Sequence, residues 1–308
     1  LLASLKKITG ATTALMGDVP FTRYTFILHF QRSPTCGAGM EHRDGTAICF
    51  PAEDLGRRWV GLEATLAHEF LHAWNVKRIR PQNLEPVDYV RGNDTRDLWF
   101  SEGLASTYQW LILLRAGLIE RQDFHRELAG EIARLQSRPA RHHQSVEQAG
   151  LEAWLEKYPD YLRPERSISY YNKGALLGYL LDLAIRHHTA NRHGLDDVMR
   201  RLNLEFARRG RFFSSADLRA VIADLAPTFV GLDAFFRDYA NNIPGFFTDY
   251  ADEKTNLAGY AVNKYTELAV SFAEQLESLR AQYDIPNIVA NLIAQIRQYY
   301  PSGTYTQP

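Results

Sequence analysis

Residues 68–72 read His-Glu-Phe-Leu-His, an H-E-x-x-H motif. Side chains four residues apart lie on one face of a helix, so His68 and His72 are expected to hold one metal ion together. Glu69 lies about 100° further round that helix, where it can take a proton from water held by the ion. The spacing predicts a hydrolytic zinc site, and the alternative is two histidines that simply belong to the core.

The predicted helix around this motif is mostly apolar and carries one polar stripe. Its apolar positions are Leu62, Leu66, Phe70, Leu71, Ala73 and Trp74, and the stripe holds Thr65, His68, Glu69 and His72. A polar stripe on an otherwise buried helix is expected to line a cleft.

A third zinc ligand is expected from residues 98–114, a strongly apolar helix that begins near Glu102. A carboxylate there is costly unless it is paired or bound to metal. The alternative is a first-turn glutamate favoured by the helix dipole. The polar residues on the same face are Ser106 and Gln109. A ligating histidine also needs an orienting partner, for which Asp97 is one possibility.

Two further segments are candidates for substrate contacts. Tyr171, next to Tyr170, opens a predicted helix, and its phenol is a possible donor to a developing oxyanion, although such tyrosines usually serve packing. In residues 36–42 the glycines permit close backbone approach, and Glu41 is a possible partner for a cationic group. The alternative for this second segment is an ordinary Gly-rich hairpin loop.

Taken together, these segments resemble the glycyl aminopeptidase family, zinc aminopeptidases of the gluzincin group that typically carry a PDZ domain. The resemblance is carried by the strings GAGMEHRDGT, LAHEFLHAWNVKRIRP, LWFSEGLASTY and YYNKGALLGYLLDL. It implies that His68, His72 and Glu102 are the metal ligands and that Glu69 is the general base.

The same resemblance implies roles at the substrate. Tyr171 would stabilise the tetrahedral intermediate, and Glu41 would grip the free amino group of a peptide, with Gly39 and Met40 as neighbouring substrate contacts. The implied activity is removal of N-terminal residues, with Gly or Ala preferred. Two rivals stay open: an endopeptidase of the same fold, and a peptide-binding module without turnover. The all-β domain that usually precedes the family's catalytic domain is not recognised here, nor is a PDZ domain.

The surrounding sequence predicts an α+β fold of the thermolysin-like (gluzincin) type. Strands are expected at 23–31 and 46–50, with an irregular loop between them. A mostly helical lobe should follow, with helices near 60–76, 97–116, 121–137, 145–157, 169–188, 194–209, 214–225 and 231–240. A shorter helix is expected within residues 1–20.

Composition changes near residue 245, and this predicts a catalytic domain over 1–245 and a helical appendage over 246–308. Seven of the 16 tyrosines lie in the appendage. Its apolar spacing predicts long helices that pack on the catalytic lobe or on a second copy, so a structural role or a role in self-association is expected.

The net charge of −1 over 308 residues offers no general attraction for nucleic acid or anionic lipid. No apolar run approaches the roughly 18 residues of a membrane span. The expected partners are peptides with a free N-terminus. The missing signal-peptide pattern favours the cytoplasm, but a chain that reads as internal to a longer product leaves the compartment open. Cys36 and Cys49 are expected either to pair or to stay as two free thiols.

Overall fold

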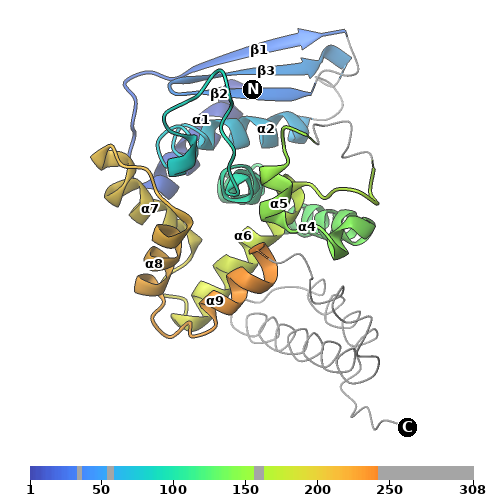
Figure 1. Cartoon of the computed structure of the whole chain (residues 1–308). Helices are drawn as coiled ribbons and strands as arrows, with labels where there is room; N and C mark the ends of the chain where they lie inside the picture. Colours follow the sequence, from blue (N-terminus) through green and yellow to red (C-terminus); the bar gives the residue numbers. More distant parts are fainter. Residues whose placement is uncertain (33–36, 54–58, 156–162, 242–308) are drawn as a thin grey trace. The chain divides into compact units, whose positions relative to one another are not determined.

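A small sheet and a larger set of helices make up the computed structural model, which describes residues 1–32, 37–53, 59–155 and 163–241 (Figure 1). These residues belong to one unit, Leu1–Pro244. The α+β class is as predicted from the sequence, but the small sheet has three strands where two were expected. The expected appendage, residues 246–308, lies outside the described residues, so its boundary and its role stay predictions.

The sheet has three strands in the order β1-β3-β2. β1 (Thr25–Gln31) runs parallel to β3 (Gly45–Pro51), and β2 (Ala38–His42) pairs with β3 in the antiparallel sense. The expectation of an irregular loop was wrong for Ala38–His42. Glycine and glutamate are disfavoured in strands, but pairing with β3 outweighs that local preference here.

Two helices lie beneath the sheet (Figure 1), namely α1 (Leu2–Met16) and α2 (Trp59–Leu71). α2 contacts β2 and β3, and the apolar positions expected for this helix are buried. Each such side chain contributes about 1.5–3 kcal/mol on burial. The helix ends at Leu71 rather than near residue 76, and turns follow it. His72 still continues the helical pattern, since its amide donates to the carbonyl of His68.

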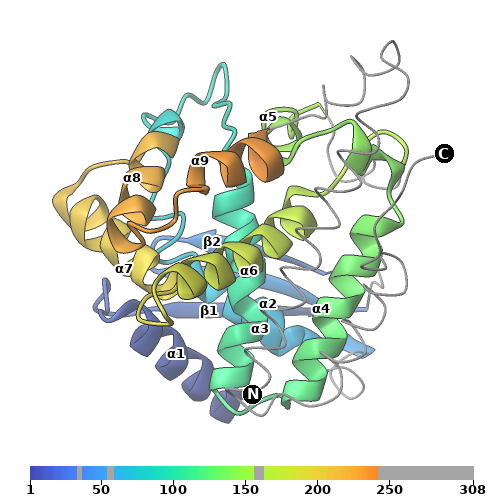
Figure 2. The same cartoon turned by 90° about the horizontal axis from the view of Figure 1, so that it is seen from below.

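The single helix expected over 97–116 is divided into a π-helical turn, η3 (Trp99–Gly103), and α3 (Leu104–Arg115). A long helix, α6 (Tyr170–His188), packs against both (Figure 2). A Cβ atom on Gly103 would lie 2.5 Å from the Cα of Gly174, so the two backbones approach closely. Glycine alone permits this contact. It brings the first turn of α6 against the turn that carries Glu102.

The remaining helices complete the helical lobe. They are α4 (Arg121–Gln136), α5 (Val146–Leu151), α7 (Leu195–Glu205), α8 (Ser215–Leu225) and α9 (Leu232–Phe235), which a π-helical turn continues over Phe236–Asn241. Gly117 and Gly210, which lie just beyond helical segments, have φ angles of 61° and 63°, in the left-handed region that glycine adopts most readily. Ser214 forms a capping box with Asp217 at the start of α8. The helix expected over 145–157 is shorter, because α5 ends at Leu151.

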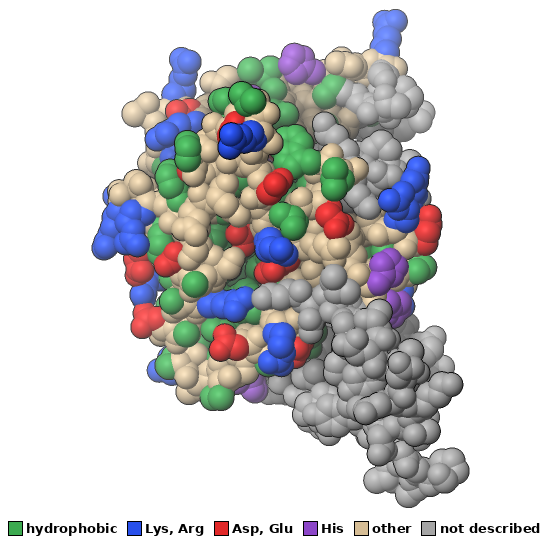
Figure 3. Space-filling view, in the orientation of Figure 1, with side chains coloured by type: hydrophobic (Ala, Val, Ile, Leu, Met, Phe, Trp, Pro, Cys, Tyr) green, Lys and Arg blue, Asp and Glu red, His purple; other side chains and the backbone are tan. Residues whose placement is uncertain are grey.

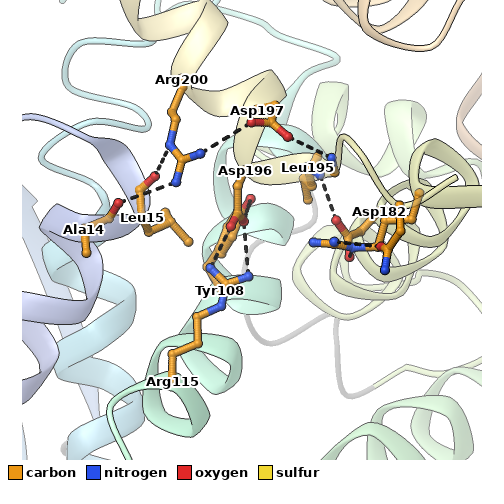
Figure 4. Close-up of polar contacts among 12 residues, drawn as sticks. Ala14, Leu15, Tyr108, Arg115, Asp182, Leu195, Asp196, Asp197 and Arg200 are labelled. Carbon is orange, nitrogen blue, oxygen red and sulfur yellow. Dashed lines mark hydrogen bonds and ion pairs between the residues drawn. The ribbon is translucent and has the colours of Figure 1, made fainter. Parts of the chain in front are cut away.

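A polar network joins α7 to three other helices (Figure 4). The Tyr108 hydroxyl on α3 donates to Asp196 at 3.0 Å, and the Leu195 amide donates to Asp182 on α6 at 2.7 Å. Arg200 donates to a carbonyl of α1 at 2.7 Å. Asp196 lies in the first turn of α7, where the helix dipole stabilises a carboxylate. The network therefore fixes α3 and α6, which position the candidate site.

Acidic and basic side chains are interspersed on the face that Figure 3 shows, in keeping with the net charge of −1. Among the described helices, none combines the length and the apolar character that crossing a membrane requires. Cys49, on β3, is disulfide-bonded. Cys36 lies outside the described residues.

Candidate active site

Three side chains from two segments form a compact cluster in the lobe next to the sheet. His68 lies on α2, His72 directly follows that helix, and Glu102 lies in η3. Glu102 Oε2 is 3.2 Å from the Nε2 atom of each histidine. One ligand atom from each residue lies within 4.8 Å of the others, so a single metal ion can contact all three. The structure thus brings together the three residues predicted as ligands.

The two imidazoles are oriented by acceptors at their other nitrogens. His68 Nδ1 lies 3.2 Å from the amide oxygen of Gln109 on α3, and His72 Nδ1 donates to the backbone carbonyl of Asn75 at 2.6 Å. A carbonyl only accepts, so the proton sits on Nδ1 and Nε2 faces Glu102. The suggestion of Asp97 as orienting partner was wrong, because its carboxylate accepts from Ser215 at 2.8 Å instead.

The π-helical turn determines where the third ligand points. A π turn is wider than an α turn and is often found at functional sites. Asn75 donates through Nδ2 to the carbonyls of Phe100 and Ser101, each at 3.1 Å. Ser106, four residues after Glu102, donates to the backbone carbonyl of Glu102 at 3.0 Å. Backbone contacts therefore hold the turn while the Glu102 carboxylate stays directed at the histidines.

The cluster is strongly coupled electrostatically. Burial disfavours the charged form of His72, but the charge and hydrogen bond of Glu102 outweigh it and raise the pKa of His72 to about 9. Burial likewise opposes ionisation of Glu102, yet His72 and His68 hold the pKa of Glu102 well below its usual range. Glu102 is therefore ionised, and the proton that it helps to hold on His72 must leave when a divalent cation binds between these side chains.

Glu69 lies beside the cluster and not within it. Its side chain is buried, and its Oε2 atom has no hydrogen-bond partner among the described residues. Burial raises the pKa of Glu69 and is only partly offset by His72 and His68. Gly39 on β2 passes so close that a Cβ atom there would overlap the Glu69 carboxylate. The close approach explains why a glycine occupies position 39. Burial and the raised pKa give Glu69 the features of a general base.

Tyr171 lies at the start of α6, beside the histidines. Its ring stacks against His68 with 6.1 Å between the ring centroids, and it also stacks against Tyr170 with 4.9 Å between centroids. The Ser169 side chain caps the helix by accepting from the Asn172 amide. Tyr170 is buried whereas Tyr171 is partly exposed, so Tyr171 is the one of the pair that can reach a substrate.

Glu41, predicted to bind a substrate amino group, lies on β2 and pairs with Lys77. The Lys77 Nζ atom is 2.9 Å from Glu41 Oε1, and about a fifth of each side chain is exposed. Glu41 is near enough to the cluster that its charge helps to raise the pKa of Glu69 and of His72. Met40 is largely exposed on the opposite face of the same strand. Lys77 is not among the site residues predicted from the sequence.

The residues present fit a single zinc ion. Two neutral imidazole nitrogens and one carboxylate make the three-ligand set of catalytic zinc sites. Both histidines have orienting partners, and the unpartnered Glu69 oxygen lies beside the set, where a general base belongs. From the sequence, Gln109 is recognisable only as a polar residue on an apolar helix, and Asn75 is not among the predicted site residues. The available signal for Asn75 is that it is a polar residue in the otherwise apolar stretch directly after His72.

Comparison with known proteins agrees with this geometry. Residues 62–177 match the family model of the M61 glycyl aminopeptidases. The match contains both histidines, Glu69, Glu102 and Tyr171, and it confirms the resemblance predicted from the sequence. Glu41 lies outside the matched residues. A comparison with curated proteins found no match.

A solved structure from Idiomarina loihiensis, described as an aminopeptidase N family protein, has a similar fold. Its TM-score is 0.73 at 26% sequence identity, and the likeness covers 78% of this chain and 42% of that chain. The chain therefore spans less than half of that protein's length. The family match and this neighbour both support the prediction of a peptidase hydrolase.

Proposed function

We propose that the chain is the catalytic part of a zinc-dependent aminopeptidase that removes small N-terminal residues, Gly or Ala, from peptides. The observation that carries the proposal is the His68–His72–Glu102 cluster beside a buried Glu69 oxygen that no described residue hydrogen-bonds. The matched family supports peptide hydrolysis as the reaction. Peptides with a free N-terminus are the proposed partners, and the thermolysin-like assignment of the fold is part of the same proposal.

When bound, zinc supplies Lewis acidity for the scissile carbonyl and lowers the pKa of water. The remaining steps belong to this chain. Glu69 accepts the proton of the attacking water, which its raised pKa and buried position favour. The Tyr171 hydroxyl donates to the developing oxyanion. Glu69 then passes the proton to the leaving amine, and Gly39 leaves room for its carboxylate.

Restriction to free N-termini is assigned to Glu41, whose carboxylate would accept from the substrate's ammonium group. A carboxylate has about four acceptor positions, so the ion pair with Lys77 does not exhaust it. The pair nevertheless favours a second candidate function. If Lys77 alone satisfies Glu41, the carboxylate is structural, and the site would act as an endopeptidase on internal bonds.

The two functions are separated by three substrates given to the zinc-loaded full chain: alanine amide, alanyl peptide and the same peptide N-acetylated. The aminopeptidase proposal expects hydrolysis of the first two and none of the third. Hydrolysis of the acetylated peptide at an internal bond would establish the endopeptidase instead. Zinc binding without hydrolysis of any substrate would identify a silent peptide-binding module. Glu69→Gln is the matched control, because it should retain zinc and show no activity.

A further inference from the structure

Asn75 connects the two segments that supply the three ligands. It is fully buried, three residues beyond His72. Its backbone carbonyl accepts from His72 Nδ1 at 2.6 Å, while its side-chain amide donates to the carbonyls of Phe100 and Ser101. One residue thus contacts a ligand on one side and the turn of another ligand on the other.

The geometry requires such a connection. The spacing of His68 and His72 follows from one helix, because residues four apart lie on the same face. Glu102 comes from a different segment, so its distance from the histidines depends on how η3 packs against the end of α2. The backbone hydrogen bonds of a π turn are made within the turn itself and do not tie it to α2. Two lateral hydrogen bonds from a buried amide restrict its rotation and therefore the direction of Glu102.

We propose that Asn75 is a positioning residue that sets the separation of Glu102 from His72 and thereby the metal affinity. The inference rests on the metal site of the proposed function. The Oδ1 atom of Asn75 has no hydrogen-bond partner among the described residues, although it is buried. An unpaired buried oxygen is costly, and the two hydrogen bonds that Nδ2 donates to Phe100 and Ser101 offset that cost.

The test measures metal binding and needs no turnover. Zn²⁺ and Co²⁺ dissociation constants of the full chain are determined by competition with a chromophoric chelator, for the wild type, Asn75→Ala, Glu102→Gln and the double variant. Asn75→Ala keeps the backbone carbonyl that orients His72, so it removes only the link to η3. We expect it to weaken metal binding by roughly 10–100-fold, as is usual when a group supporting a ligand is removed.

The double variant separates positioning from general destabilisation. If Asn75 acts through Glu102, Asn75→Ala should change the affinity less than roughly twofold once Glu102 is already Gln, because interacting residues are not additive. The visible spectrum of bound Co²⁺ should also change in Asn75→Ala. Asn93→Ala is the matched control, since Asn93 Nδ2 likewise donates to two backbone carbonyls at 3.1 Å, those of Asn83 and Pro86. Its metal affinity should equal that of the wild type.

Asn75→Asp is a second variant of the same shape, in which carboxylate oxygens face the two carbonyls, and it serves where Asn75→Ala does not fold. Wild-type metal affinity in either folded variant, or a loss that simply adds to that of Glu102→Gln, would overturn the inference while leaving the proposed function intact. A wild-type chain that binds neither ion would overturn both.

Discussion

Replacing Glu102 with Gln removes the charge of the third ligand and keeps its shape. The pKa of His72 rises from 6.5 to about 9, and Glu102 is the main group that raises it against the effect of burial. The Glu102 carboxylate therefore stabilises a positive charge at His72, and its Oε2 atom is 3.2 Å from the Nε2 atom of each histidine. A divalent cation between the same atoms experiences the same carboxylate. We therefore expect Glu102→Gln to weaken zinc binding by roughly 100-fold or more, at or beyond the upper end of the roughly 10–100-fold lost when a group that only supports a ligand is removed.

Glu69→Gln is the matched variant, since it makes the same chemical change in the same pocket. Glu69 is not a ligand in our assignment, so the zinc affinity of the Glu69→Gln variant should stay close to that of the wild type. Its kcat should fall by roughly 10²–10⁴-fold, the usual contribution of a general base. The assay is chelator competition at neutral pH, followed by alanine amide hydrolysis with saturating zinc. Tight zinc binding by Glu102→Gln, or loss of zinc from Glu69→Gln, would refute the division of roles.

Three further predictions concern the same region. Tyr171→Phe should lower kcat roughly 100-fold with little change in KM, because the phenol donates mainly in the transition state. Tyr170→Phe should lower kcat far less, and equal losses in the two variants would contradict the assignment of Tyr171. Zinc affinity should rise with pH up to about pH 9 and then level off, because the proton that His72 holds below its pKa must leave when metal binds. Zinc dissociation constants measured from pH 6 to 10 test this, and a pH-independent affinity would contradict it. Gly174→Ala should lower the free energy of unfolding by roughly 1–3 kcal/mol, because the added Cβ would lie 2.7 Å from the carbonyl oxygen of Trp99. Gly130→Ala has open space around the added Cβ and should raise the free energy of unfolding by up to about 1 kcal/mol, and chemical denaturation compares the two variants.

The sequence predicted the helical elements well where a long apolar period was present. The helix expected over 169–188 is α6 at Tyr170–His188, because capping by Ser169 and a continuous buried face act locally. The sequence did not predict β2, because the residues of this strand have poor strand propensity and form a strand only through pairing with β3. It also placed the end of α2 near residue 76, because Trp74 continues the apolar period after the helix has ended at Leu71.

For the candidate site, the sequence by itself determined the residue types and the ligand spacing of His68 and His72, since four residues make one helical turn. Only the tertiary structure decided what those side chains meet. The acceptor for His68 is Gln109, 41 positions away, and the amide that holds the Glu102 turn comes from Asn75. The partner of Glu41 is Lys77, on a different segment. Local periodicity follows from neighbouring residues, whereas these contacts depend on how separate segments pack, which no short stretch of sequence encodes.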